Sequence, residues 1–252
     1  MLNLDKFISS LETDLVWRKK EVTNLLLLCD DSNGEVIIKS SILLIYAHWE
    51  GYVKNSCKHY LEYVSQKSIL ITELTGNFRA ISLKGQIKQL IDSQDGLTLS
   101  NEILFIKSID GEVPKRFKVG RNFKNNEKDK SIVNTKDNLN YRVFNSLLDV
   151  VGLAKKPCIE SKEIFLDEKL LNNRNKIAHG SKIDTAGEEF GIAIEEVKII
   201  KDFVFSVLDS LMDDLKYYAE EEFYLQENIT YLNDYNERSN ELLNKNLRVL
   251  FS

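Results

Sequence analysis

Proline is the residue whose near absence most constrains this chain. The 252 residues contain two prolines, Pro114 and Pro157, and 11 glycines. Proline ends or kinks helices and marks the turns between short strands, so its scarcity leaves long uninterrupted stretches. Hydrophobic residues make up 43% of the chain and charged residues 29%, which is typical of a globular protein with a core. We therefore predict an all-α protein.

Apolar residues recur at helical spacing through most of the sequence. In the first segment, Leu4, Phe7, Leu11 and Leu15 share one face. The first two segments are long enough to form an antiparallel hairpin, from which a four-helix core can begin. The spacing predicts helices over about 4–29, 35–65, 82–93, 101–109, 136–151, 161–178, 193–225 and 227–250.

One segment, residues 113–130, is strongly basic. The net charge of −5 argues against a protein that coats nucleic acid with its whole surface. Within 113–130, glycine and asparagine predict a loop, and Phe117 and Phe123 alternate with the cations, as in a flexible loop that grips a nucleic-acid strand. A solvated connection between helices is the alternative. The candidate binding residues are Lys115, Arg116, Lys118, Arg121 and Lys124.

The cysteines and the hydropathy indicate a location. Cys29, Cys57 and Cys158 are odd in number and unclustered, which does not fit a disulfide framework and fits a reducing compartment. No apolar run approaches the roughly 18 residues of a membrane span. We expect a cytoplasmic protein with no membrane association.

The run from Arg174 to Gly180, RNKIAHG, carries the clearest chemistry. Arg174 offers a planar fork suited to phosphate oxygens, and His179 can accept or give a proton near neutral pH. At about 100° per residue, the two side chains lie about 140° apart on a regular helix. Either the long arginine side chain crosses the last turn, or a second copy of the helix completes the site. Glu168, Asn172, Asn175 and His179 are predicted to share one polar stripe.

The spacing from Arg174 to His179 resembles the R-x4-6-H signature of the HEPN superfamily. Two further segments, residues 46–54 (YAHWEGYVK) and 17–21 (WRKKE), resemble segments of one branch of this superfamily, the RiboL-PSP-HEPN-like nucleases. Members of that branch resemble this chain over nearly its full length. The resemblance implies an all-α HEPN-type bundle with additional helices, and a homodimer with the two motifs facing one another. It also implies an endoribonuclease that needs no metal or other cofactor and acts in toxin–antitoxin or antiviral defence systems, in some cases under an inhibitory or activating partner protein.

The resemblance also assigns roles to residues. His179 is expected to act as general base or acid, Arg174 to neutralise charge on the phosphate, and Asn175 to bind a phosphate oxygen or orient the imidazole. Because the family pairs these helices, His48 or Glu50 is expected to support His179. The basic segment is expected to attract the RNA backbone.

For domain organisation we predict a single HEPN-like domain, 1–252. Its core helices lie in about 1–65 and 136–225. The long middle section, about 66–135 with the basic loop 113–130, departs from a minimal HEPN domain and is treated as an insertion. A C-terminal helix of about 227–250 follows, which packs on the domain or serves a partner.

A metal site is not expected. His48 and His59 are eleven residues apart, a rise of about 16 Å along a helix, whereas one zinc binds each ligand at about 2 Å. The sequence also lacks the P-loop, HExxH and GxSxG motifs, so NTPase, zinc protease and serine hydrolase classes have no support.

Two other classes stay open. A non-catalytic HEPN module that binds a partner protein or RNA keeps the helical core and uses Arg174 and His179 only structurally. A generic helical scaffold tolerates replacement of His179 by glutamine.

Overall fold

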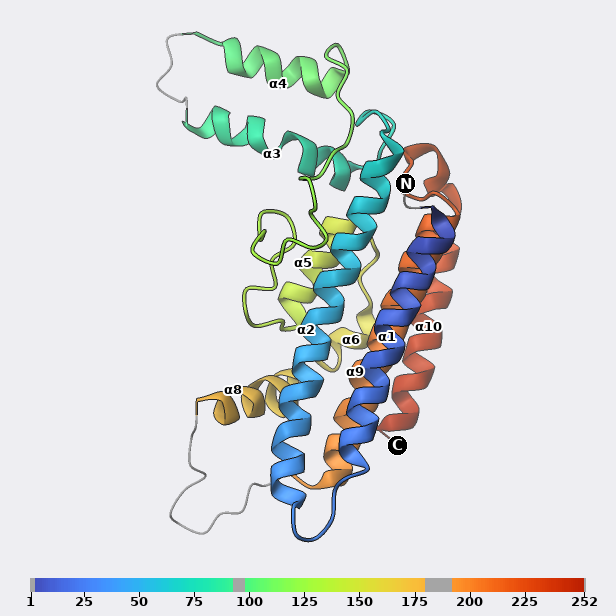
Figure 1. Cartoon of the computed structure of the whole chain (residues 1–252). Helices are drawn as coiled ribbons and strands as arrows, with labels where there is room; N and C mark the ends of the chain where they lie inside the picture. Colours follow the sequence, from blue (N-terminus) through green and yellow to red (C-terminus); the bar gives the residue numbers. More distant parts are fainter. Residues whose placement is uncertain (1–2, 93–97, 180–191, 252) are drawn as a thin grey trace.

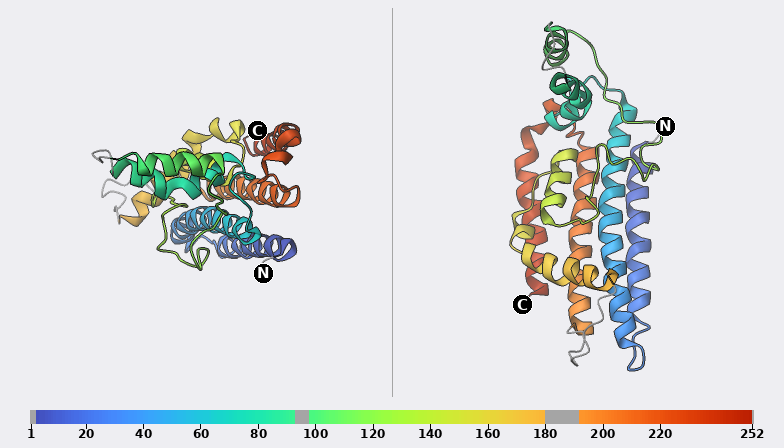
Figure 2. Two further views of the ribbon diagram at one scale, coloured as in Figure 1. Left: turned by 90° about the horizontal axis from the view of Figure 1, so that it is seen from above. Right: turned by 90° about the vertical axis from the view of Figure 1, so that its left-hand side faces the viewer.

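The computed structural model describes residues 3–92, 98–179 and 192–251 of the chain. The body is built from the long helices α1 (Leu4–Leu26), α2 (Gly34–Lys67), α9 (Ile194–Glu220) and α10 (Leu232–Leu250). Figures 1 and 2 show them side by side, with α9 packed against α1, α2 and α10. The short connection between α1 and α2 makes them the predicted antiparallel hairpin.

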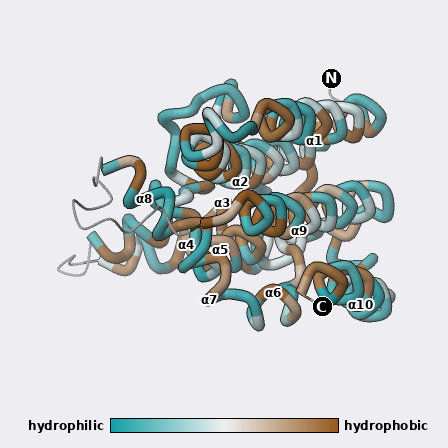
Figure 3. The backbone as a smooth tube through the Cα atoms, turned by 90° about the horizontal axis from the view of Figure 1, so that it is seen from below, coloured by the Kyte–Doolittle hydropathy of each residue, from teal (hydrophilic) through white to brown (hydrophobic). Residues whose placement is uncertain are grey.

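The core lies between these helices. Trp49, Tyr52 and Tyr60 of α2 are completely or almost completely buried, as are Phe7 of α1 and Leu208 of α9. Figure 3 shows hydrophilic residues along the outer edges of α1, α9 and α10, as expected for amphipathic helices around one core.

The middle section forms a helical hairpin and a long loop. Helices α3 (Gly76–Asp92) and α4 (Ser100–Asp110) pack together and project beyond one end of the body (Figure 1). The loop 111–140 then returns along α2 to α5 (Tyr141–Val151), which packs against α2 and α3.

Short helices lead from α5 to α9. They are α6 (Pro157–Glu160), α7 (Glu163–Phe165), the π-helix η1 (Leu166–Asn172) and α8 (Asn173–Ala178), and the 3-10 helix η2 (Gln226–Tyr231) precedes α10.

The all-α prediction is confirmed, since the described residues form helices, turns and loops with only two isolated β-bridges. Several boundaries differ from the predicted ones. The helix expected from about 136 begins at Tyr141, because Lys136 and Asp137 have φ angles of 58° and 57° and Asn140 caps the helix at Val143 N. The helix predicted over 161–178 is observed from Glu163 to Ala178, but its middle part, η1, is π-helical between α7 and α8. The division into core, insertion and C-terminal helix stays a prediction.

Among the described helices, none combines the length and the apolar character that a membrane crossing requires.

Candidate functional site

The predicted motif lies on α8, a helix of six residues that follows the π-helix η1. The π-helix is anchored by buried Leu166, Leu170 and Leu171 and by Lys169, whose ammonium lies 2.7 Å from Glu196 on α9. The Asn173 side chain donates to the carbonyls of Glu168 and Lys169 at 3.1 and 2.8 Å. π-Segments are frequent at functional sites. Its wider turn also changes the rotation per residue on which the stripe Glu168–Asn172–Asn175–His179 was predicted, and the stripe stays a prediction.

Arg174 is half-buried against α2. Its guanidinium carbon lies 4.2 Å from the centre of the Tyr46 ring, and its Nη1 donates to Asn175 Oδ1 at 2.7 Å. A cation over an aromatic face is attracted by the negative charge of the ring face. The structure therefore brings Arg174 and Asn175 together and fixes the guanidinium on Tyr46.

Tyr46 is itself held from two sides. Its hydroxyl oxygen accepts a hydrogen bond from the Leu139 N–H at 3.0 Å and donates to Glu50. Glu50 in turn accepts, at its Oε1, a hydrogen bond from the Thr135 hydroxyl. Burial, reinforced by the Glu50 carboxylate, raises the pKa of Tyr46 to about 12. Glu50 is therefore linked to Arg174 through Tyr46.

His179 ends α8 and is exposed. Its backbone N–H donates to the Asn175 carbonyl at 3.0 Å. Within the described part of the chain its ring makes no hydrogen bond or ion pair with Arg174 or with any other residue. This arrangement agrees with the 140° separation, and it does not bring Arg174 and His179 together within one chain.

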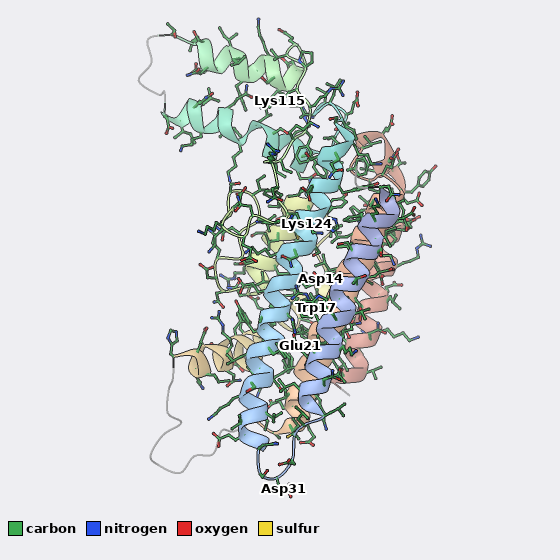
Figure 4. All side chains as sticks on the ribbon, in the orientation of Figure 1. Asp14, Trp17, Glu21, Asp31, Lys115 and Lys124 are labelled. Carbon is green, nitrogen blue, oxygen red and sulfur yellow. The ribbon has the colours of Figure 1, made fainter. Side chains whose placement is uncertain are left out.

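His48 lies on a different face of α2, turned toward α1. Its Nδ1 lies 3.2 Å from Arg18 Nη1 and its Nε2 lies 2.9 Å from Glu21 Oε2, while the Trp17 ring meets it edge-on at 5.2 Å. Arginine can only donate, so Nδ1 accepts and the neutral ring carries its proton on Nε2, toward Glu21. Burial and then the Arg18 charge lower the pKa of His48. Figure 4 shows Asp14, Trp17 and Glu21 in succession along α1. The structure thus places His48 away from Arg174.

The basic segment 113–130 is packed rather than open. Phe117 and Phe123 are fully buried, so the expectation that their rings are presented to a strand was wrong. Both rings pack against the helical body. The Phe117 ring meets Phe78 of α3 edge-on at 5.0 Å, and the Phe123 ring lies 5.1 Å from the Lys58 ammonium of α2.

Most of the candidate cations of this segment already have acceptors. Lys115 donates to Ser82 O at 2.6 Å, and Lys124 to Ser10 Oγ at 3.1 Å; Figure 4 places these two lysines well apart along the loop. Arg116 and Lys118 donate to the Ser68 and Ser65 carbonyls at the end of α2, where cations are favoured by the helix dipole. Arg121 is exposed. Their role in RNA binding stays a prediction.

Sequence reasoning missed the surroundings of Arg174. Tyr46 belongs to the family-like block 46–54 but is not among the predicted site residues, and neither are Lys54, Lys130 and Asp137. The spacing of Tyr46, Glu50 and Lys54, four residues apart on one helix, is the signal that marks this face of α2.

No group of three or more histidine, cysteine, aspartate or glutamate side chains is arranged as metal ligands would be among residues 3–92, 98–179 and 192–251.

The fold and the α8 motif together define a helical bundle with an Arg–x4–His pair at a helix end. Comparison with protein families agrees, because the family model described as HEPN_MAE_28990:/-like HEPN matches residues 7–224. The chain belongs to this HEPN family. The matched range runs from α1 through the α3–α4 hairpin and past α9. No curated protein and no solved structure matches the chain significantly. The narrower resemblance to the RiboL-PSP branch stays a prediction.

Proposed function

We propose that this protein is a HEPN-type endoribonuclease that cleaves RNA without a metal ion. The observation that carries the proposal is the fixed position of Arg174, stacked on Tyr46 and bonded to Asn175, five residues before the exposed His179. A permanent cation and a titratable imidazole at one helix end are the groups that phosphodiester cleavage by an internal nucleophile requires.

The chemistry follows from these side chains. The RNA 2′-oxygen attacks the neighbouring phosphorus, its proton passes to a base, and the 5′-oxygen leaves with a proton from an acid. The products are a 2′,3′-cyclic phosphate and a 5′-hydroxyl. His179 serves as base or acid, Arg174 stabilises the charge that builds on the phosphate oxygens, and Asn175 positions Arg174 or a phosphate oxygen.

We propose that the complete site needs two copies of the chain. Arg174 faces α2 of its own chain while His179 faces solvent at the end of α8, so an Arg174 and a His179 from different copies can flank one phosphate. Mixing tests this directly. Arg174→Ala and His179→Ala proteins, each inactive alone, are expected to regain part of the wild-type rate when co-expressed as a heterodimer; no regain would contradict the shared site.

The biological setting belongs to the same proposal. A role in toxin–antitoxin or antiviral defence, with a partner protein that restrains or triggers cleavage, rests on family membership. Cytoplasmic location is supported by three free cysteines at 29, 57 and 158.

The test of the activity is cleavage of labelled single-stranded RNA in EDTA by wild type, Arg174→Ala, His179→Ala and His179→Gln. The matched control is Lys176→Ala, which removes an exposed cation from the same helix. We expect cleavage by wild type and the control only. Equal cleavage by all five proteins indicates a contaminating nuclease, and no cleavage by any of them, with or without cell extract, favours the alternative of a non-catalytic HEPN module.

A further inference from the structure

One face of α2 leads from the basic segment to Arg174. Tyr46, Glu50, Lys54 and Lys58 follow one another at intervals of four residues and so share a face. The loop lies along this face in the opposite direction. Its carbonyls at Asn126 and Asp129 accept from Lys58 at 2.7 and 2.8 Å, Glu127 O accepts from Lys54 at 3.3 Å, Thr135 donates to Glu50, and Leu139 donates to Tyr46.

The loop makes an unusual turn where it reaches Arg174. Lys136 and Asp137 are consecutive non-glycine residues in the left-handed region, with φ of 58° and 57°. Such conformations persist only where their surroundings impose them, and they cluster at binding sites. Here the hydrogen bonds of Thr135 and Leu139 to α2 fix both ends of the turn, and Asn134 Oδ1 accepts from the Lys136 N–H at 2.9 Å.

The turn carries an exposed carboxylate, Asp137, that pairs with a lysine of the same loop. Asp137 Oδ1 lies 2.6 Å from Lys130 Nζ, and both side chains are open to solvent, with exposed fractions of 78% and 43%. The hydrogen bond from Lys130, and then the positive charges of Lys130, Lys54 and Arg174, hold the pKa of Asp137 below its usual range. The hydrogen bonds at both ends of the turn place it beside the other two cations. Leu139 donates to Tyr46, on whose ring Arg174 of α8 lies, and Thr135 donates to Glu50, one turn of α2 from Lys54.

We propose that Lys54 and Lys130 form, beside Arg174, a subsite for a backbone phosphate of single-stranded RNA, and that Asp137 occupies its cations until RNA displaces it. The proposal rests on the proposed function for the position of Arg174 at the scissile phosphate. A phosphodiester carries the same single negative charge as the carboxylate and two free oxygens, so it can replace Asp137 between these cations. The subsite extends the site toward the basic segment along α2.

The experiment measures binding separately from cleavage. The probe is a fluorescein-labelled single-stranded oligonucleotide with 2′-O-methyl groups throughout, which lacks the 2′-nucleophile and cannot be cut by this chemistry. Fluorescence anisotropy gives Kd over a series of salt concentrations. The variants are Lys54→Ala, Lys130→Ala and Asp137→Asn, and the matched control is Lys245→Ala, an exposed lysine on α10. Asparagine is chosen because it tolerates a positive φ and keeps the turn.

We expect Lys54→Ala and Lys130→Ala each to raise Kd about three- to fivefold, the range of an exposed charge pair. Each should also lower the slope of log Kd against log salt by about 0.7, as for one phosphate contact on a single strand. Asp137→Asn should tighten binding about threefold, and Lys245→Ala should change nothing. Circular dichroism confirms that each variant is folded.

The subsite is overturned if both lysine variants bind like wild type, if Asp137→Asn weakens binding, or if wild type does not bind the probe at low salt. These results are separate from a failure of the proposed function. A protein that binds the probe in the expected pattern and does not cut unmodified RNA retains the subsite and loses the nuclease.

Discussion

Two faces of α2 carry ionisable groups, and they are used differently. The face toward α1 holds His48, whose two ring nitrogens lie 3.2 and 2.9 Å from Arg18 and Glu21. The face toward α8 holds Tyr46 and Glu50, which support an arginine that is only half-buried. Ionisable residues two positions apart on α2 therefore have different surroundings. On the closed face His48 lies between two side chains of α1, whereas on the open face the supported arginine stays partly exposed to solvent.

The largest expected effect concerns the open face. Arg174→Ala should lower kcat for RNA cleavage about 10²- to 10³-fold, as removal of one transition-state donor does. The free energy of unfolding should change by about 1 kcal/mol or less, because one cation–π contact is lost. Single-turnover cleavage and urea unfolding measure the two quantities. A large loss of stability with little loss of rate would make Arg174 a structural residue like Arg18.

Two substitutions at Tyr46 separate the role of its ring from the role of its hydroxyl. Tyr46→Leu should lower kcat about 10- to 100-fold, because the guanidinium loses the surface that positions it. Tyr46→Phe keeps the ring, so we expect a rate near that of wild type and a loss of about 1–3 kcal/mol of stability from the unpaired Leu139 N–H. The same rates in both variants would show that the ring does not position Arg174.

The closed face should control the pH dependence of stability. His59 shares this side of α2, and burial, followed by the nearby charge of Lys124, lowers its pKa to about 4. An unfolded histidine titrates near pH 6.5, so the unfolded state takes up the proton first. Stability is fully present above pH 6.5 and is lost as the pH falls toward 4.

We therefore expect wild type to lose about 2 kcal/mol more than His59→Gln between pH 7 and pH 4.5 in urea unfolding. Parallel losses in the two proteins would mean that other groups cause the acid sensitivity.

The smallest expected effect is at Gly51. A Cβ atom at this position would lie 2.9 Å from Arg18 Nη1, so Gly51→Ala must displace a buried guanidinium that also contacts Asp14 and His48. We expect a loss of about 1–2 kcal/mol in the free energy of unfolding and an unchanged cleavage rate. A changed rate with unchanged stability would indicate that the two faces are coupled.

Much of the fold could be predicted from the sequence because periodic apolar stripes depend on local spacing. The apolar stripes that contain Phe7, Trp49 and Leu208 predict α1, α2 and α9, respectively, close to their observed bounds. The π-helix could not be predicted, since no proline or glycine marks it and it depends on anchors such as Lys169 to Glu196 on another helix. The turn at Lys136 and Asp137 likewise depends on hydrogen bonds to α2.

The residue types of the candidate site could be predicted from the sequence, but the side chains that surround them could not. Arg174 and His179 stand out by residue type, but the ring that holds Arg174 lies 128 positions earlier in the chain, at Tyr46. The opposite case is the basic segment, whose cations stand out by composition while packing gives Lys115 and Lys124 acceptors within the protein.

We propose that the open face of α2 and the end of α8 form the RNA-cleaving site. The most direct measurement is the chemical identity of the 3′ ends that wild type produces from single-stranded RNA in EDTA, with His179→Gln beside it. We predict 2′,3′-cyclic phosphate ends from wild type and none from the variant. Ends that carry a 3′-hydroxyl, or the same ends from both proteins, would show that His179 does not cleave RNA by 2′-oxygen attack.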